Sequence, residues 1–290
     1  MNELNDEENN ELYTSISDAL NKTIKNLDEY YTKDYGNNEQ YLNTGFSNLY
    51  LRKGDLIVLA SKHDISSFVA SLIDNIAIKS KKPLGYISCG EKDEVAVCSK
   101  LLSHITRVPL YKINGGNLKK SDFKEFIDKA GSLYEAPIFI DDSPNWMFEE
   151  IEFTARIMVK EQRVELIIID SFHFLAEIVQ ADKDELPFVQ YNLLKQYKEV
   201  SKRLNIPIII LMNLPGFDDY EPSISDFKGN MEIPRTVDQV LLLHKERIPE
   251  DLVECDATLI TAKNAHGINL RIPLKYESSI GIYSSAEECE

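Results

Sequence analysis

The chain has 290 residues and a formal net charge of −16, with 48 acidic and 32 basic side chains. A surface of that sign repels a phosphate backbone, so strong nucleic-acid binding would need a concentrated basic patch, and the sequence contains only short lysine clusters. The four cysteines show no metal-ligand spacing, the N-terminus is polar and acidic, and no apolar run approaches the length of a membrane span. These features predict a cytoplasmic protein that has no signal peptide and does not enter a membrane.

Residues 1–10 are mostly Asn, Asp and Glu, a composition typical of disorder. Beyond them, apolar residues recur every three or four positions. This spacing predicts one amphipathic helix over 11–31, followed by a linker containing Gly and Asn that runs to residue 43. The apolar stripe of the helix needs a partner surface. It consists of Leu12, Ile16, Leu20, Ile24, Leu27 and Tyr31.

From residue 44 to about 283 the chain alternates between strand and helix patterns. The predicted strands are continuous apolar runs, which are typical of strands covered on both faces, so we expect a mainly parallel sheet with helices on each side. These strands are 55–60, 83–88, 137–140, 165–170 and 206–212, and the helices lie near 66–79, 91–104, 121–132, 147–161 and 189–204. The strands at 238–244, 255–263 and 269–275 have no helices between them, which indicates the antiparallel edge of a RecA-like α/β domain. Residues 284–290 form an acidic tail.

The segment from Asp55 to Phe68 organises this domain. An apolar run of strand length ends in a short polar loop and is followed by apolar residues at helical spacing, which is the first unit of a nucleotide-binding α/β domain. A phosphate-binding loop in this place would contain glycine and end in Gly-Lys-Ser/Thr. Here the corresponding residues are Ser66, Ser67 and Phe68, and the loop has no glycine.

Other short segments follow in a fixed order along the chain: Asn43–Phe46, Lys53–Ala60, Ala136–Pro144, Ile167–Asp170 and Leu204–Ile208. Each is unspecific by itself, but the ordered series from residue 41 to about 283 resembles the C-terminal domain of DnaB-type replicative DNA helicases. The resemblance implies a RecA-like P-loop NTPase fold. It also implies that helix 11–31 corresponds to the linker helix that packs on the neighbouring subunit of a ring in those helicases.

The resemblance indicates where ATP and magnesium would bind, and the residues at those positions depart from the family pattern. The phosphate-loop lysine aligns with Ser67, the magnesium-binding hydroxyl with Phe68, and the preceding glycine with Ser66. A family serine aligns with Asp64, which follows His63 in the same loop and places a negative charge where phosphate would lie. We therefore expect neither ATP nor magnesium nor any other metal as a cofactor.

Other positions implied by the resemblance are partly retained. The catalytic glutamate aligns with Gly90, and a later glutamine aligns with Asn213. The lysine and arginine that reach into the neighbouring subunit align with Lys263 and Ala265. Asp170, at the position that holds a magnesium-bound water in the family, is present. Because its partners are lost, we expect its carboxylate to hydrogen-bond a loop instead.

The loop 182–185 is acidic where the helicases have DNA-facing loops, so weak or no DNA binding is expected. The histidines lack a second ligand at helical or hairpin spacing, apart from His173 near Asp170, and we expect them to be surface or core residues. The sequence thus predicts a non-hydrolysing binding, regulatory or assembly module in DNA replication or repair, which self-associates or binds a replication protein through helix 11–31. The alternative is an ATP-dependent DNA helicase with an unconventional or weak ATPase site.

Overall fold

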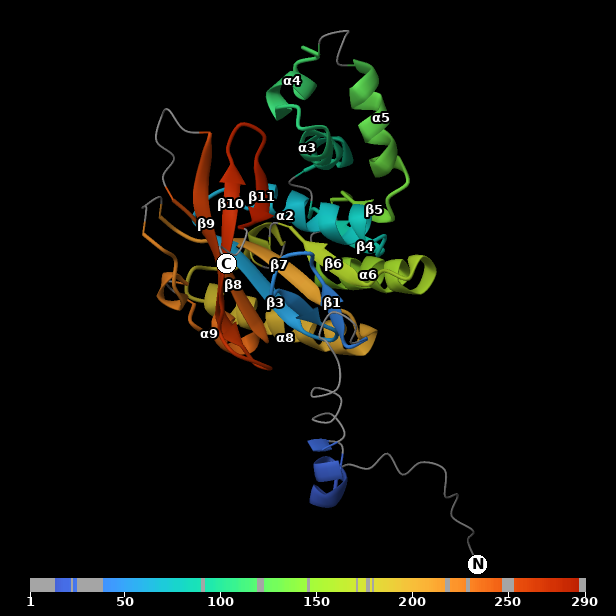
Figure 1. The fold of residues 1–290 in the computed structure, drawn as a ribbon. Helices are drawn as coiled ribbons and strands as arrows, with labels where there is room; N and C mark the ends of the chain where they lie inside the picture. Colours follow the sequence, from blue (N-terminus) through green and yellow to red (C-terminus); the bar gives the residue numbers. More distant parts are fainter. Residues whose placement is uncertain are drawn as a thin grey trace, which may run out of the picture. The chain divides into compact units, whose positions relative to one another are not determined.

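The computed structural model describes residues 14–21, 23–24, 39–89, 92–118, 123–144, 147–170, 172–175, 178, 180–216, 220–227, 230–246 and 253–286. The chain divides into two compact units, Met1–Tyr41 and Leu42–Glu290. Figure 1 shows the course of the chain. Of the helices that the structure describes, none is both long and apolar enough to cross a membrane.

In the first unit, residues 16–21 and 23–24 are helical, within the helix predicted over 11–31. The hydroxyl of Ser15 accepts a hydrogen bond from the backbone N–H of Asp18 (3.1 Å) and so caps the first turn. The apolar side chains are not buried: Ile16 is 86% exposed, and Leu20 and Ile24 are each 55% exposed. The other three residues of the stripe, Leu12, Leu27 and Tyr31, lie outside the described residues.

The second unit contains a sheet of nine described strands in the order β11-β10-β9-β8-β3-β7-β6-β4-β5. Six neighbouring strands are parallel: β3 (Leu56–Ser61), β4 (Leu84–Ile87), β5 (Ile138–Asp141), β6 (Leu166–Ile169), β7 (Ile208–Asn213) and β8 (Gln239–Lys245). The antiparallel edge consists of β9 (Glu254–Asn264), β10 (Arg271–Glu277) and β11 (Ile282–Ser285). The predicted mainly parallel sheet with an antiparallel edge is confirmed. Strand β3 lies near its centre, between β7 and β8.

Three short strands differ from the sequence-based expectation because strand pairing creates them. The short strand β1 (Tyr41–Asn43) lies inside the predicted linker and pairs with β2 (Tyr50–Arg52) in a separate two-stranded sheet. Strand β11 has no counterpart among the predicted strands, because it contains no long apolar run. Its register on β10 joins Tyr276 to Tyr283.

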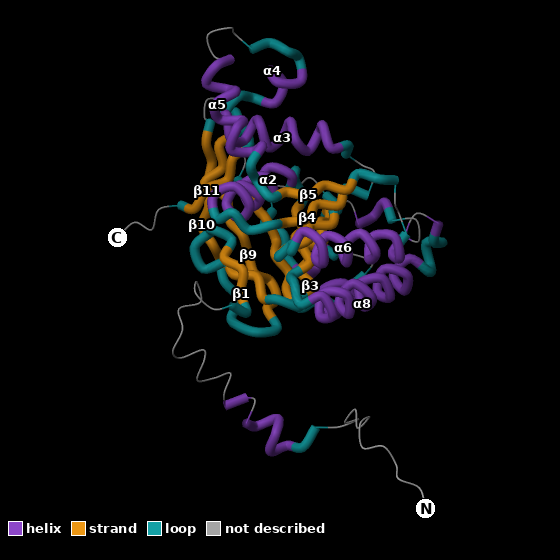
Figure 2. Tube along the Cα trace, turned by 90° about the vertical axis from the view of Figure 1, so that its right-hand side faces the viewer, coloured by secondary structure: helices purple, strands orange, loops and turns teal. Residues whose placement is uncertain are grey.

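Helices cover both faces of the sheet, as Figures 1 and 2 show. The bounds are α2 (Ser66–Ile73) with a π-helical continuation (Asp74–Lys79), α3 (Glu94–Thr106), α4 (Leu110–Asn114), α5 (Phe123–Tyr134), α6 (Phe148–Gln162), α8 (Leu186–Leu204) and α9 (Glu232–Thr236). Side chains alternate along β3: Ile57 and Leu59 join the core beneath α2 and α3, whereas Val58 joins the core beneath α6 and α8. All six residues of β3 are buried. Because β3 lies in the middle of the strand order, the loop after it lies in the middle of the edge formed by the carboxyl ends of the parallel strands.

Candidate functional site

The loop between β3 and α2 supplies its own negative charge to the first turn of α2. The Asp64 carboxylate accepts hydrogen bonds from the backbone N–H of Ser66 (3.0 Å) and from the hydroxyls of Ser66 (2.6 Å) and Ser67 (3.1 Å). Backbone N–H groups at a helix start are the groups that bind phosphate in phosphate-loop proteins. In this chain the Asp64 carboxylate, from the loop itself, accepts a hydrogen bond from such an N–H group in place of a phosphate.

Lys100, on α3, reaches the same place from across a helix interface. Its ammonium nitrogen donates to Ser67 Oγ (2.8 Å) and lies 3.9 Å from an Asp64 carboxylate oxygen. Partial burial raises the pKa of Asp64, but the hydrogen bonds from Ser66 and the charge of Lys100 outweigh it and hold the pKa below its ordinary value. Asp64 is therefore a carboxylate at neutral pH, and its charge would repel an incoming phosphate.

Phe68, at the position of the family's magnesium-binding hydroxyl, is part of the hydrophobic core. Its side chain is fully buried, its ring stacks on Phe46 with centroids 5.0 Å apart, and it meets the ring of Tyr283 edge-on at 5.6 Å. Position 67 is equally enclosed. Ser67 is 2% exposed, and a Cβ added to Gly281, whose φ is +67°, would lie only 2.8 Å from Ser67 Oγ. The turn after β10 thus closes over the position where the family has its lysine.

Asp170 ends β6 at the same edge of the sheet and is paired. Its side chain accepts a hydrogen bond from the Tyr86 hydroxyl and lies 2.7 Å from the ammonium nitrogen of Lys92, which precedes α3. Only 4% of Asp170 is exposed. Asp170 is thus held by a strand tyrosine and by a partly exposed lysine, so a magnesium ion would have to compete with Lys92 for this carboxylate.

Two other predicted positions lie near this edge, and one cannot be placed. The Cα of Asn213 pairs with that of Ser61 in the β3–β7 register, so Asn213 stands beside the start of the loop, where it is exposed. It also lines a separate cavity of about 390 Å³. The backbone N–H of the half-buried His63 donates to Ser61 Oγ (3.0 Å). Gly90 lies outside the described residues.

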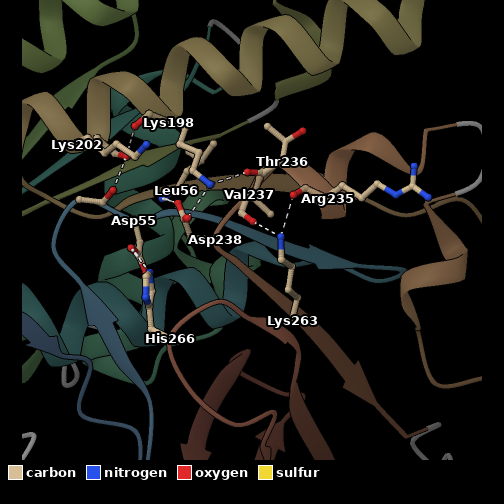
Figure 3. Close-up of polar contacts among 12 residues, drawn as sticks. Asp55, Leu56, Lys198, Lys202, Arg235, Thr236, Val237, Asp238, Lys263 and His266 are labelled. Carbon is tan, nitrogen blue, oxygen red and sulfur yellow. Dashed lines mark hydrogen bonds and ion pairs between the residues drawn. The ribbon is translucent and has the colours of Figure 1, made fainter. Parts of the chain in front are cut away.

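Lys263 lies at the opposite, amino edge of the sheet, because its partner in the β8–β9 register is Val240, near the start of β8 (Figure 3). Its ammonium nitrogen donates to the backbone carbonyls of Arg235 (3.0 Å) and Val237 (2.6 Å). Burial and the charge of Lys198 hold the pKa of Lys263 below its ordinary value. Lys263 is thus hydrogen-bonded within its own chain, and it lies at the opposite edge of the sheet from the loop between β3 and α2.

A cluster of metal-ligand type beside Lys263 has no local signal in the sequence. One possible ligand atom from each of Asp55, Asp238 and His266 lies within 4.8 Å of the others, although the sequence alone predicts that His266 is an isolated histidine. The His266 Nε2 atom is 3.1 Å from Asp55, and Arg52 is 3.5 Å from the same carboxylate.

Asp238 in this cluster is already neutralised. It is 2.7 Å from the ammonium nitrogen of Lys198 and accepts the backbone N–H of Leu56 (3.0 Å), as Figure 3 shows. Burial and the neighbouring Asp238 raise the pKa of Asp55, which His266 and Arg52 offset only in part. With two cations already paired to its carboxylates, the cluster fits a structural link between β3, α8 and the turn after β9 better than a cation site.

Comparisons with known proteins agree with the geometry. A family model for the DnaB-like helicase C terminal domain matches residues 42–285. The replicative DNA helicase DnaB of Treponema pallidum (strain Nichols) is 27% identical over 244 residues, which cover 82% of this chain and 52% of that protein. The chain therefore spans about half the length of this relative.

Two solved structures share the fold. One is described as an ATPase domain and has a TM-score of 0.75 and 16% identity, covering 95% of this chain and 100% of that chain. The other, a DnaB-like replicative helicase described together with its interactions with primase, has a TM-score of 0.77 and 16% identity, covering 94% of this chain and 71% of that chain.

Proposed function

This chain belongs to the family of DnaB-like helicase C-terminal domains, and we propose that within that family it has lost ATP hydrolysis and acts as a binding, regulatory or assembly module in DNA replication or repair. The observation that supports this proposal is the Asp64 carboxylate on the first turn of α2, bound by Ser66 and Ser67. An internal anion there takes the N–H and O–H donors that a phosphate would need, and its charge opposes a second anion.

The lysine and the hydroxyl that this chain lacks at positions 67 and 68 are groups that position and stabilise the phosphates in phosphoryl transfer. Catalysis of this reaction is almost entirely positioning and charge stabilisation, and removing one stabilising group typically costs about 100-fold or more in rate. The chain has no lysine at position 67 and no hydroxyl at position 68. Asp170, the retained carboxylate, is already paired with Lys92.

The direct test is calorimetric titration of the whole chain with ATP and magnesium, together with a phosphate-release assay. We expect neither tight binding nor turnover. Replacing the first three residues of α2 together (Ser66→Gly, Ser67→Lys and Phe68→Thr) in an Asp64→Ser background should recover some nucleotide binding, because it removes the internal anion and restores the missing donors. Magnesium-dependent turnover by the unmodified chain, abolished by Asp170→Asn, would show that the proposal is wrong.

That outcome would favour the second candidate, an ATP-dependent DNA helicase with an unconventional or weak ATPase site. Two observations support this alternative. The strand, loop and helix of a phosphate-loop unit follow in order as β3, residues 62–65 and α2, and Asp170 and Lys263 keep the residue types of the family. A helicase would also require Lys263 to leave its carbonyl partners and reach a neighbouring chain.

Weak DNA binding is part of the proposal. The net charge is −16, and residues 182–185 are acidic where the family resemblance places a DNA-facing loop. Affinity that depends on phosphate contacts requires clustered cations. Fluorescence anisotropy with a single-stranded oligonucleotide at physiological salt should therefore give no sub-micromolar binding, and a sub-micromolar affinity under those conditions would contradict this part.

Self-association, or docking on a replication protein, is proposed to use helix 11–31. Ile16, Leu20 and Ile24 recur every fourth residue and are all more than half exposed. Burying an aliphatic side chain contributes about 1.5–3 kcal/mol, so covering this stripe would stabilise a complex by several kcal/mol. The location we propose for this module is the cytoplasm.

The matched experiment adds negative charge to different faces of the helix. Leu20→Asp with Ile24→Asp should dissociate an assembly. Leu20→Asp alone should weaken it, whereas Asn21→Asp, about 100° around the helix from Leu20, should leave its mass unchanged. Mass measurement by light scattering over a range of protein concentrations separates the two results. A wild-type mass of one chain at every concentration would exclude self-association.

A further inference from the structure

A cavity of about 300 Å³ lies between α2 and α3, and Asp64 and Ser66 line its end next to the loop after β3. Its walls are mainly apolar: Val69 and Ile73 line it from α2, and Val97 and Leu101 line it from α3. The volume is at the lower end of the range of small-molecule sites, about 300–1,000 Å³. The two helices lie next to each other in Figure 1.

The charged residues that line this cavity are two lysines and one aspartate, Asp64, so that a single anionic group would balance their charges. Lys100 lines it together with Lys92, and the two side chains are only 22% and 31% exposed. Lys92 is paired at 2.7 Å with Asp170, but the carboxylate nearest to Lys100 is 3.9 Å away, beyond hydrogen-bond distance. Among the contacts that the structure describes, the hydrogen bond of Lys100 goes to a neutral hydroxyl, Ser67 Oγ.

The charge of Lys100 is therefore incompletely balanced. Burial lowers the pKa of Lys100, the charges of Lys92 and Lys245 lower it further, and Asp64 offsets only part of this. An anionic group that reached this ammonium would replace a neutral contact with a charge-assisted hydrogen bond. This concentration of cations lies in a chain whose net charge is −16.

We propose that this cavity binds a small carboxylate with an apolar body, whose carboxylate accepts a hydrogen bond from Lys100 while its body packs between α2 and α3. The apolar walls favour such a ligand over a polyphosphate, because a triphosphate would bury several charges against one or two cations and beside the Asp64 carboxylate. The cavity shares Asp64 and Ser66 with the loop site, but binding of a carboxylate to Lys100 does not depend on whether ATP is hydrolysed.

Calorimetric titration of the whole chain with octanoate tests the proposal, with 1-octanol and octylammonium as probes of the same chain length. Octanoate should bind at least about tenfold more tightly than octanol, because a hydrogen bond to a charged group adds that much affinity, and octylammonium should not bind. Equal affinity for octanoate and octanol, or no binding of octanoate at millimolar concentration, would overturn it.

Variants locate the site. Lys100→Met keeps the length of the side chain and should weaken octanoate about tenfold while leaving octanol unchanged. Ala96→Phe, at an exposed cavity-lining position of α3, should abolish binding of both probes by filling the cavity. Lys160→Met on α6, away from the cavity, is the matched control and should bind octanoate like the wild type. Thermal unfolding checks that each variant is folded, and unaltered octanoate binding in both cavity variants would refute the assignment.

Discussion

The loop around Asp64 and the end of β9 around Lys263, two places where the family resemblance puts nucleotide chemistry, differ from each other in their residue types and in their contacts. At the carboxyl edge, the loop around Asp64 has lost the residue types, and core packing of Phe68 and the close approach of Gly281 now occupy their places. At the amino edge, Lys263 keeps its residue type, but its ammonium is bound to two carbonyls of its own chain. The first loss can be reversed only by substitution and repacking. The second is a matter of hydrogen-bond partners, which a conformational change could alter.

The largest expected effect on stability comes from restoring a hydroxyl at position 68, in the first turn of α2. Phe68→Thr should lower the free energy of unfolding by about 3 kcal/mol or more, because it removes a fully buried ring from its contacts with Phe46 and Tyr283 and leaves a cavity. Phe153→Thr is the matched control, since it makes the same exchange in helix α6 at a residue that is 55% exposed. We expect that control to cost about 1 kcal/mol or less in urea denaturation. Equal costs for the two variants would mean that Phe68 does not anchor the loop to the core.

A smaller effect on stability is expected at Lys263. Lys263→Met should lower the free energy of unfolding by about 1–2 kcal/mol, because it leaves the carbonyls of Arg235 and Val237 without their donor. Lys275→Met on the neighbouring strand β10 removes an exposed pair with Asp256 and should change it by about 0.5 kcal/mol or less. If Lys263→Met changes the free energy of unfolding as little as this control, the hydrogen bonds of Lys263 contribute little to stability and the lysine is free to act on another chain. The sites around Asp64 and Lys263 would then differ less than the structure indicates.

The smallest effect concerns how the contribution of Asp64 to stability depends on pH. The pKa of Asp64 is lower in the folded chain than its ordinary value, so the stability that its carboxylate contributes is present above about pH 4 and is lost as the pH falls through the folded-state pKa. Asp64→Asn should therefore flatten the acid limb of a stability–pH curve. Because the side chain is 58% exposed, we expect a change of less than about 1 kcal/mol.

A double-mutant cycle separates this effect from a general effect of surface charge. In a Ser66→Ala background, Asp64 loses one of its hydroxyl donors, so Asp64→Asn should change the acid limb less than it does in the wild type. An identical change in both backgrounds would mean that the Asp64–Ser66 contact does not set the pKa of the carboxyl.

Much of the fold was predictable because its signals are local. The apolar run at 55–60 is typical of a strand covered on both faces, so the pattern indicated a strand of a parallel sheet before any pairing was known, and the structure has β3 at Leu56–Ser61. The absence of a lysine at position 67 and of a hydroxyl at position 68 could also be read from the sequence, since it does not depend on the surroundings of Ser67 and Phe68. Strand β11 was not predictable in the same way, because it exists only through its pairing with β10.

The partners of the retained polar groups were decided by the tertiary structure alone. Lys92 meets Asp170, Lys100 meets Ser67, and His266 meets Asp55 across 78, 33 and 211 positions of sequence. No periodicity extends over such separations, because each pair forms only when strands and helices from distant parts of the chain are packed side by side. Residue types thus determined which family residues are absent from positions 66–68. Packing decided how the remaining charges are neutralised, because the energy of a charge pair depends on distance and burial rather than on position in the sequence.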